Sequence, residues 1–374
     1  MERNVDRRHF IKLTGAAGMA AIAGCGGGND GESGPTATAT STETATPTEE
    51  ETPTPTDQPK DLPDPTETDP IVSPATLKEW QDAGIVNMDE TGDTERVVIL
   101  RTGDTDAYED GHVPGAIPWA ATAAKRMEGL AQVAPIVPNG ATMDNILKRS
   151  GVCPKTSVVI SSPIPLRAAR AYWNLRYWGF PRERVKVLDG GYGAYKEEYS
   201  LASGAEPTHP TTAFSVRDNS ELNKMHRLGM AQMIQRVDLK HEGERDDVFI
   251  DNRPDPTATI DTAIVDDPAN YIEGPKFSSA APWKSAEEIA DHFWSKDGVE
   301  EGDAIVTYCG SGYRAAMGYF ALDAILGYDN VAVYDGSFSK QWKHYDANAE
   351  PVVPNDHWRV DIKDRTEGPT GESS

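Results

Sequence analysis

The chain repeats one order of predicted elements in two long segments. In each segment an apolar strand is followed by a loop with a short strand, a second apolar strand, a helix, and a last strand that runs into a turn. Short strands that alternate with helices are typical of parallel βαβ units, and so long a repeat indicates a duplicated domain. We therefore predict an α/β fold with two tandem domains, each a mainly parallel sheet flanked by helices. The predicted elements span residues 96–101, 108–119, 157–161, 167–178 and 185–191, and then residues 247–251, 271–283, 304–308, 314–326 and 331–337.

A cysteine stands where a strand of the second copy meets its helix. Cys309 follows the apolar run 304–308. Free loop amides and the positive end of a helix stabilise a thiolate, which is the nucleophilic form of cysteine. The stretch therefore predicts covalent sulfur chemistry at Cys309. Its cradle is predicted from Gly310, Ser311, Gly312, Tyr313 and Arg314.

The first copy provides an internal comparison for this loop. Aligning the two predicted helices places Cys309 on Ser162. A serine hydroxyl is not ionised near neutral pH without a base. Pro163 and Pro165 stand where the second copy has glycines, and proline has no amide N–H. The first loop has lost both the nucleophile and two hydrogen-bond donors, and we predict that it is catalytically silent.

Together these features resemble the tandem rhodanese domains of sulfurtransferases. The resemblance rests on the Gly-His-Val-Pro-Gly-Ala element at 111–116 and on the Cys-x-x-Gly-x-Arg loop that begins at Cys309, and it covers about residues 71–350. In that architecture the C-terminal copy is active and the N-terminal copy is not. The second copy departs from the family at 274–280, which read Gly-Pro-Lys-Phe-Ser-Ser-Ala instead of Gly-His-Ile-x-Gly-Ala.

The resemblance implies a double displacement. Cys309 takes the outer sulfur of thiosulfate or 3-mercaptopyruvate, becomes a persulfide, and passes the sulfur to cyanide or a thiol. Gly310 and Ser311 favour 3-mercaptopyruvate, while Arg314 and an extracytoplasmic location leave thiosulfate open. The sequence has no Cys/His cluster with metal-ligand spacing, and we expect no cofactor.

Charged residues near the predicted strand ends are further candidates for the site. The resemblance makes Asp251 and Arg253 candidates, Asp251 to order the local backbone and Arg253 to bind the anionic donor. Arg314 would steady the loop or attract the donor, and its counterpart Arg167 persists in the silent copy, which favours a structural role. Residues 335–337 (Asp-Gly-Ser) read as a turn, and Trp119 and Trp283 as core or interface residues.

Two other functions remain open at this point. Related folds dephosphorylate with a Cys-x5-Arg loop, but the spacing from Cys309 to Arg314 is Cys-x4-Arg. The shorter loop is a smaller cradle, better suited to a sulfur atom than to a tetrahedral phosphate. The alternative from another class is a non-catalytic persulfide carrier or binding module, which the same loop would also serve.

The N-terminus is predicted to be an export signal rather than part of the fold. Arg7 and Arg8 precede the apolar run 13–24, which is short for a membrane span, and Cys25 follows as the lipidation residue of a lipobox. We predict a protein exported with a twin-arginine signal and lipid-anchored on the outer face of the cell membrane. The predicted segments are 1–24 (signal), 25–70 (disordered Thr/Pro/Glu-rich linker), 71–205 (silent domain), 206–360 (catalytic domain) and 361–374 (flexible tail).

The charge balance argues against one class of partner. The formal net charge of −24 argues against binding nucleic acid through a basic surface. Such acidity also fits a protein from a high-salt environment, an idea that equal thermal stability at low and molar KCl would contradict. Of the three cysteines, Cys153 and Cys309 stand at non-equivalent points of the repeat, so we expect no disulfide between them and assign Cys153 no role.

Overall fold

The computed structural model describes residues 62–88, 96–103, 107–119, 126–128, 133–218, 226–274 and 281–344. The predicted signal, Cys25, residues 26–61 of the predicted linker and the predicted tail lie outside these residues. None of the helices in the described ranges is long and apolar enough to cross a bilayer.

The first domain is built on a five-stranded sheet with the order β1-β7-β6-β2-β3, in which all neighbouring strands are parallel. A small antiparallel pair, β4-β5, follows β3 in the chain. The strands are β1 (Ile71–Val72), β2 (Val97–Thr102), β3 (Ala116–Trp119), β4 (Arg126–Glu128), β5 (Val133–Ile136), β6 (Ser157–Ser161) and β7 (Val185–Leu188). The helices are η2 (Pro65–Glu67), α1 (Pro74–Asp82), α2 (Gly140–Ser150), α3 (Pro165–Tyr177), η3 (Arg182–Arg184) and α4 (Gly191–Glu198).

The second domain repeats this plan. Its parallel sheet has the order β10-β9-β11-β12-β8, which is the order of the first sheet read from its β3 edge. The predicted fold of two tandem α/β domains is therefore confirmed. The strands are β8 (Arg227–Leu228), β9 (Val248–Asp251), β10 (Ile264–Val265), β11 (Ile305–Tyr308) and β12 (Val331–Tyr334). The helices are α5 (Met230–His241), η5 (Pro268–Tyr271), α6 (Ala286–Trp294), α7 (Tyr313–Phe320), η6 (Ala321–Ile325), η7 (Ser337–Gln341) and η8 (Trp342–His344).

The edge strand of the second sheet differs from the repeat-based prediction. The repeat places this strand just before Trp283, as β3 ends at Trp119, but β10 at Ile264–Val265 pairs with β9 instead. In the first domain His112 stacks on Tyr108 with ring centroids 3.9 Å apart, just ahead of β3. The second copy lacks that histidine-containing element, and Trp283 makes an isolated antiparallel bridge to Ile272.

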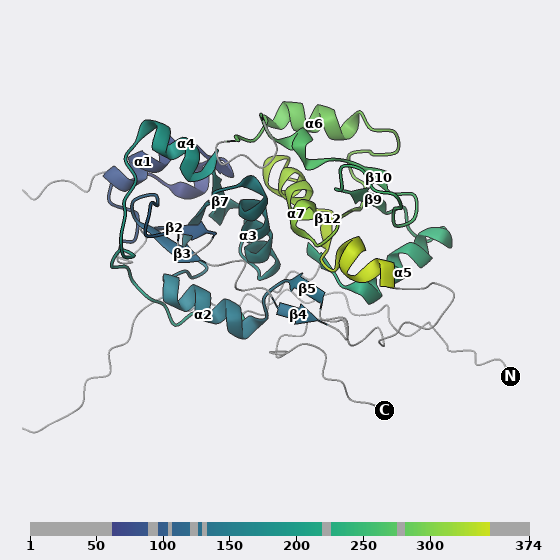
Figure 1. Ribbon diagram of the computed structural model, residues 1–374, viewed down its shortest axis with the longest axis horizontal. Helices are drawn as coiled ribbons and strands as arrows, with labels where there is room; N and C mark the ends of the chain where they lie inside the picture. Colours follow the sequence, from purple (N-terminus) through teal and green to yellow (C-terminus); the bar gives the residue numbers. More distant parts are fainter. Residues whose placement is uncertain are drawn as a thin grey trace, which may run out of the picture.

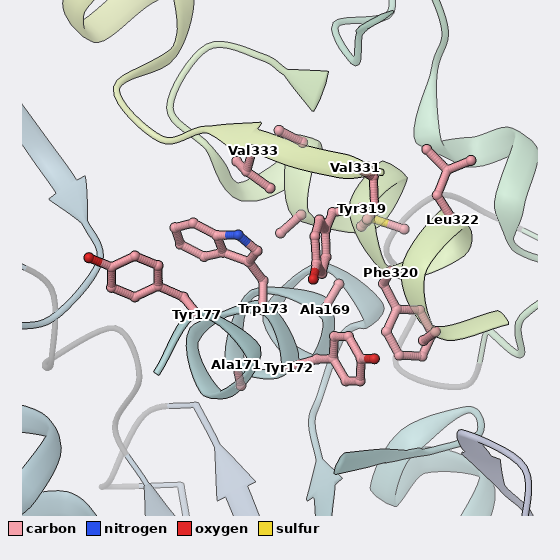
Figure 2. Close-up of a cluster of buried hydrophobic side chains, with 14 of the residues drawn as sticks. Ala169, Ala171, Tyr172, Trp173, Tyr177, Tyr319, Phe320, Leu322, Val331 and Val333 are labelled. Atoms are coloured by element: carbon pink, nitrogen blue, oxygen red, sulfur yellow. The ribbon is translucent and has the colours of Figure 1, made fainter. Parts of the chain in front are cut away.

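Helices α3 and α7 pack against each other between the two sheets (Figure 1). Every residue of α3 from Ala168 to Tyr177 is buried, as expected for a helix covered on all sides. The Tyr172 ring meets the Phe320 ring edge-on at 4.9 Å, and Phe320 also contacts Trp283 at 4.5 Å. Figure 2 shows these aromatic side chains of α3 and α7 together with Val331 and Val333 of β12. The two domains therefore share one hydrophobic core.

A reciprocal pair of hydrogen bonds crosses the domain boundary. The Val137 amide of the first domain donates to Asp335 Oδ2 at 2.8 Å, and the Trp283 amide of the second donates to Asp189 Oδ1 at 2.9 Å. Asp189 and Asp335 are equivalent, since each directly follows the strand (β7 or β12) that lies next to the central strand. Each domain thus donates one backbone amide to the residue that follows a strand of the other domain, at the end of the sheet where α/β folds place their ligands.

A buried histidine at this boundary makes the fold sensitive to acid. His226 is 2% exposed, and its Nδ1 pairs with the Tyr319 hydroxyl at 2.7 Å. Burial lowers the pKa of His226 from 6.5 to about 4. The Arg176 and Arg182 guanidinium groups act in the same direction, while the Asp323 carboxylate opposes them.

This shift predicts a pH dependence of stability. His226 binds a proton near pH 6.5 in the unfolded chain but only near pH 4 in the folded chain. The contribution of His226 to the free energy of unfolding is therefore fully present above pH 6.5 and is lost as the pH falls towards 4. We expect His226 to lower the free energy of unfolding by on the order of 3 kcal/mol between pH 7 and pH 4. Urea unfolding across this range measures it. His226→Asn, which keeps a partner for Tyr319, should flatten the slope, and an unchanged slope would contradict the assignment.

Candidate active site

Strand β11 delivers Cys309 to the base of a tight loop. The loop consists of residues 309–314, and its last two residues form the start of α7. The Ser311 and Gly312 amides donate to Cys309 Sγ at 3.4 and 3.2 Å. Cys309 is a free thiol, 2% exposed. Two aimed amides and a helix N-terminus together stabilise negative charge on this sulfur.

Gly312 gives the loop its shape. Its φ of +83° lies in the left-handed region, which side chains other than hydrogen rarely allow. A Cβ on Gly312 would lie 2.9 Å from both the Asp335 carbonyl oxygen and Arg170 Nη1. The backbone can therefore turn its amide toward Cys309 only because no side chain is present.

The turn after β12 forms the second wall of the site. The Cys309 amide donates to Ser337 Oγ at 3.2 Å, and the Phe338 amide donates to the Cys309 carbonyl oxygen at 2.8 Å. Ser337 itself has a φ of +56°, an unusual conformation for a residue with a side chain. The sequence analysis interpreted residues 335–337 as a turn and gave them no role in the site. Because the turn follows β12, which pairs with β11, its place in the sheet was the available signal that it would reach Cys309.

Asp251 and Arg253 lie at the carboxyl end of β9, the neighbour of β11. Asp251 is fully buried and accepts from both the backbone amide and the guanidinium of Arg253, so it orders the local backbone. The Arg253 guanidinium also donates to the Ala258 carbonyl and lies 4.0 Å from the centre of the Phe338 ring. The Phe338 amide is hydrogen-bonded to the Cys309 carbonyl oxygen, so Arg253, which lies on the Phe338 ring, is close to the site. The Arg253 side chain is 13% exposed.

Asp335, below the loop, is held by two arginines. Arg170 Nη2 lies 2.7 Å from Oδ1, and Arg227 Nε lies 3.0 Å from Oδ2. Burial alone would raise the pKa of Asp335. Arg170, Arg227 and the Val137 amide outweigh burial and bring this pKa below its ordinary value.

The remaining loop residues lie at the start of α7. Arg314 is its second residue and is half-buried. Burial raises the pKa of Tyr313, against the influence of Arg170, whose guanidinium lies 5.5 Å from the centre of that ring. Of the loop residues predicted for the site, Ser311 and Gly312 donate to Cys309 Sγ, and Gly310, Tyr313 and Arg314 belong to the same loop. Arg170, Arg227 and Ser337 were missed.

The equivalent loop of the first domain has different contacts. The Ser162 hydroxyl accepts from Thr102 Oγ1 at 2.9 Å and donates to the Ile164 carbonyl at 2.8 Å. Pro165 begins α3, at a position where proline is favoured because no helical N–H bond is lost. The hydroxyl is thus committed to structural hydrogen bonds.

Cys309 forms no disulfide with Cys153. Cys153 is buried, and its amide donates to Thr156 Oγ1 at 3.1 Å. Across the described residues, no three His, Cys, Asp or Glu side chains are grouped so that they could hold a metal ion.

The Rhodanese-like domain family model matches residues 84–198 and 235–344, well over half of the chain. This chain belongs to the rhodanese family. Both matched segments contain the elements that the repeat predicts, so the family assignment made from the loop and the repeat is confirmed.

Several proteins with similar sequences are named as sulfurtransferases. The 3-mercaptopyruvate sulfurtransferase of Escherichia coli (strain K12) is 27% identical over 257 residues, covering 66% of this chain and 85% of the relative. A Haloferax volcanii protein named "Putative thiosulfate sulfurtransferase" is 25% identical over 246 residues, covering 63% of this chain and 82% of the relative.

Solved structures share the rhodanese fold. The crystal structure of SseA from Escherichia coli, a 3-mercaptopyruvate sulfotransferase, superimposes with a TM-score of 0.56 at 22% identity, covering 73% of this chain and all of SseA. A variant of EanB in complex with ergothioneine that is covalently linked to a cysteine persulfide gives a TM-score of 0.54 at 18% identity, covering 76% of this chain and 69% of EanB.

Proposed function

We propose that this rhodanese moves a sulfane sulfur from a small donor to a thiophilic acceptor through a persulfide on Cys309. The observation that carries the proposal is the pair of amides, at 3.2 and 3.4 Å, that donate to Cys309 Sγ at the start of α7. The sulfurtransferase names of the relatives and the persulfide described for EanB support it.

The proposed sulfur transfer has two steps, from the donor to Cys309 and from Cys309 to the acceptor. The Cys309 thiolate attacks the outer sulfur of the donor and forms an S–S bond. From thiosulfate, the old S–S bond breaks and sulfite leaves with its electron pair. From 3-mercaptopyruvate, the C–S bond breaks, and the carbon takes the pair and then a proton to give pyruvate. An acceptor thiolate or cyanide attacks the outer sulfur of the persulfide, and the Cys309 thiolate leaves.

The loop provides stabilisation where charge develops. A persulfide places negative charge on its terminal sulfur, one bond beyond Cys309 Sγ. Amides that are already aimed at this region require little reorganisation during the reaction. Gly310 to Arg314 would supply these donors, with Arg253 at the rim to attract the anionic donor and Asp251 to hold the backbone beneath it.

The residue beside Cys309 supports 3-mercaptopyruvate over thiosulfate as the donor. Gly310 places no cation next to the nucleophile, and a side chain there would require Ser339 Oγ, 3.3 Å from the position of a Cβ, to shift. The doubly charged thiosulfate would gain more from such a cation than 3-mercaptopyruvate would. We therefore expect a higher kcat/KM with 3-mercaptopyruvate.

Two parallel assays test the proposal. One follows sulfite and thiocyanate from thiosulfate plus cyanide, and the other follows pyruvate from 3-mercaptopyruvate. Turnover with either donor supports it. Uptake of one sulfur per chain without turnover would instead indicate a carrier, and hydrolysis of an aryl phosphate without sulfur transfer would indicate a phosphatase-like enzyme.

We further propose that the protein is exported and lipid-anchored through Cys25 on the outer face of the cell membrane. The order of twin arginine, apolar run and cysteine supports this location. In cells, wild type should sediment with membranes, and Cys25→Ser should not. Equal partition of the two proteins would count against the anchor.

A further inference from the structure

The two equivalent aspartates at the domain boundary have unequal surroundings. Asp189 and Asp335 each accept a backbone amide from the other domain. Only Asp335 is also paired with two arginines, Arg170 and Arg227, whose side chains are 4% and 2% exposed. The electrostatic surroundings act in opposite directions, because burial raises the pKa of Asp189 whereas Arg170 and Arg227 outweigh burial and lower the pKa of Asp335.

The first arginine position can be traced through strand register. Arg227 of β8 lies opposite Val333, two residues before Asp335. In the first domain Ile71 of β1 lies opposite Val187, two residues before Asp189. An isoleucine therefore occupies the position of Arg227 in the silent domain.

The second arginine position can be traced through the helices. Aligning α3 with α7, with Ala168 and Ala169 on Ala315 and Ala316, places Arg170 on Met317. Arg170 extends from the first domain to the aspartate of the second. At the reciprocal position, the helix of the second domain carries a methionine.

Comparing Asp189 with Asp335 shows which contacts a domain of this fold requires. The aspartate of the silent domain accepts one amide of the second domain and pairs with no arginine among the described residues, so an arginine pair is not required to fold such a domain. Three buried charges also carry a large desolvation cost. The arginine pair is present only on the side that contains the nucleophile.

Arg170 is also linked directly to the active-site loop. Its Nη1 donates to the Gly312 carbonyl oxygen at 3.3 Å while its Nη2 holds Asp335. Gly312 is the residue whose amide donates to Cys309 Sγ. Asp335 in turn begins the turn that holds the Cys309 backbone through Ser337. The Arg170 guanidinium therefore contacts both the loop, at Gly312, and the turn after β12, at Asp335.

We propose that Arg170, supplied by the silent domain, is a positioning residue for Cys309: by holding the Gly312 carbonyl and Asp335 together, it fixes the amides that donate to the sulfur. The first domain is then a working part of the active site of the second. In turnover assays this inference rests on the proposed sulfurtransferase function. The reactivity of Cys309 towards an alkylating agent tests it independently.

The experiment compares two arginines of one helix in the full chain. Arg170→Met copies the residue that aligns with it in α7. Arg176→Met is the matched control, because Arg176 is also buried in α3 and also pairs across the boundary, with Asp323. Each variant is measured for thermal midpoint, for kcat and KM with the donor that turns over, and for the pH profile of alkylation by iodoacetamide.

We expect Arg170→Met to lower kcat by at least about tenfold with little change in KM, and to move the alkylation profile about one pH unit higher. Arg176→Met should lower the thermal midpoint without moving the profile. If both variants shift the profile equally, or neither does, Arg170 serves only the boundary and the inference fails. A shifted profile in Arg170→Met alone, with no turnover by wild type, would overturn the proposed function and leave the positioning role standing.

A conservative variant covers the case in which Arg170→Met does not fold. Arg170→Lys keeps the charge beside Asp335 but cannot donate to both acceptors through a planar fork. It should fold and still show a several-fold lower kcat with a partial shift of the profile. A wild-type kcat together with a wild-type profile would contradict the positioning role.

Discussion

Replacing Cys309 by serine should lower sulfur transfer from thiosulfate and from 3-mercaptopyruvate by at least about a thousandfold, as expected when a nucleophile is removed. The serine hydroxyl keeps the shape of the loop but is not ionised near neutral pH, and the amides of Ser311 and Gly312 have no anion to stabilise. Thiocyanate formation and pyruvate release measure the loss. Intact mass after incubation with donor should show one added sulfur atom on wild type and none on the variant.

The silent domain provides the matched control. Ser162→Ala removes a hydroxyl at the equivalent position and should leave both activities within about twofold of wild type, because this group bonds only Thr102 and Ile164. Ser162→Cys in the Cys309→Ser background should not restore transfer, since Pro165 has no amide at the position of Gly312 and only the Ile164 amide remains to donate to the sulfur. Full activity in Cys309→Ser would exclude the persulfide mechanism.

Much of the fold could be predicted because its signals are local. Central parallel strands are buried on both faces and appear as short apolar runs, so 157–161 and 304–308 matched β6 and β11 to within one residue. The Cys309 loop was equally visible, since a nucleophile, small residues and a helix start are consecutive in sequence. The edge strand β10 was missed, because two residues leave no pattern and the repeat suggested another segment.

The support of the site could not be predicted, because it is assembled across the domain boundary. Arg170 lies among the alanines of α3, and only the packing of α3 on α7 shows that it meets Asp335. A charged residue inside an apolar helix was the available signal, but it does not identify the partner. The role of Ser337 depends on a backbone conformation that its sequence does not suggest.

Replacing Asp323 by asparagine should cost about 3–5 kcal/mol in the free energy of unfolding. Asp323 is fully buried in η6, and Arg176 donates to both of its oxygens at 3.0 and 3.1 Å. Arg182 and the Tyr172 hydroxyl also donate to it. Burial alone would raise the pKa of Asp323, but Arg176 and Arg182 lower it. The asparagine would leave the Arg176 guanidinium buried without a counter-charge, and urea unfolding measures the cost.

A substitution at Asp329 is the control for this change. Asp329 also pairs with Arg182, but its side chain is 90% exposed. Asp329→Asn removes the same charge from a solvated pair and should leave the unfolding midpoint nearly unchanged. Equal effects of the two substitutions would show that burial of the Asp323 pair does not matter.

The double variant Asp323→Leu with Arg176→Met distinguishes the value of the ion pair from the cost of breaking it. Each single substitution strands one buried charge, whereas the double substitution removes both and leaves apolar side chains of similar size. Arg182 keeps Asp329 in the double variant, but the buried Tyr172 hydroxyl loses Asp323 as its acceptor. Because desolvation offsets much of the attraction within a buried pair, the double variant should regain part of the stability lost by either single variant. Losses that simply add would show instead that the pair itself stabilises the boundary between the silent and the catalytic domain.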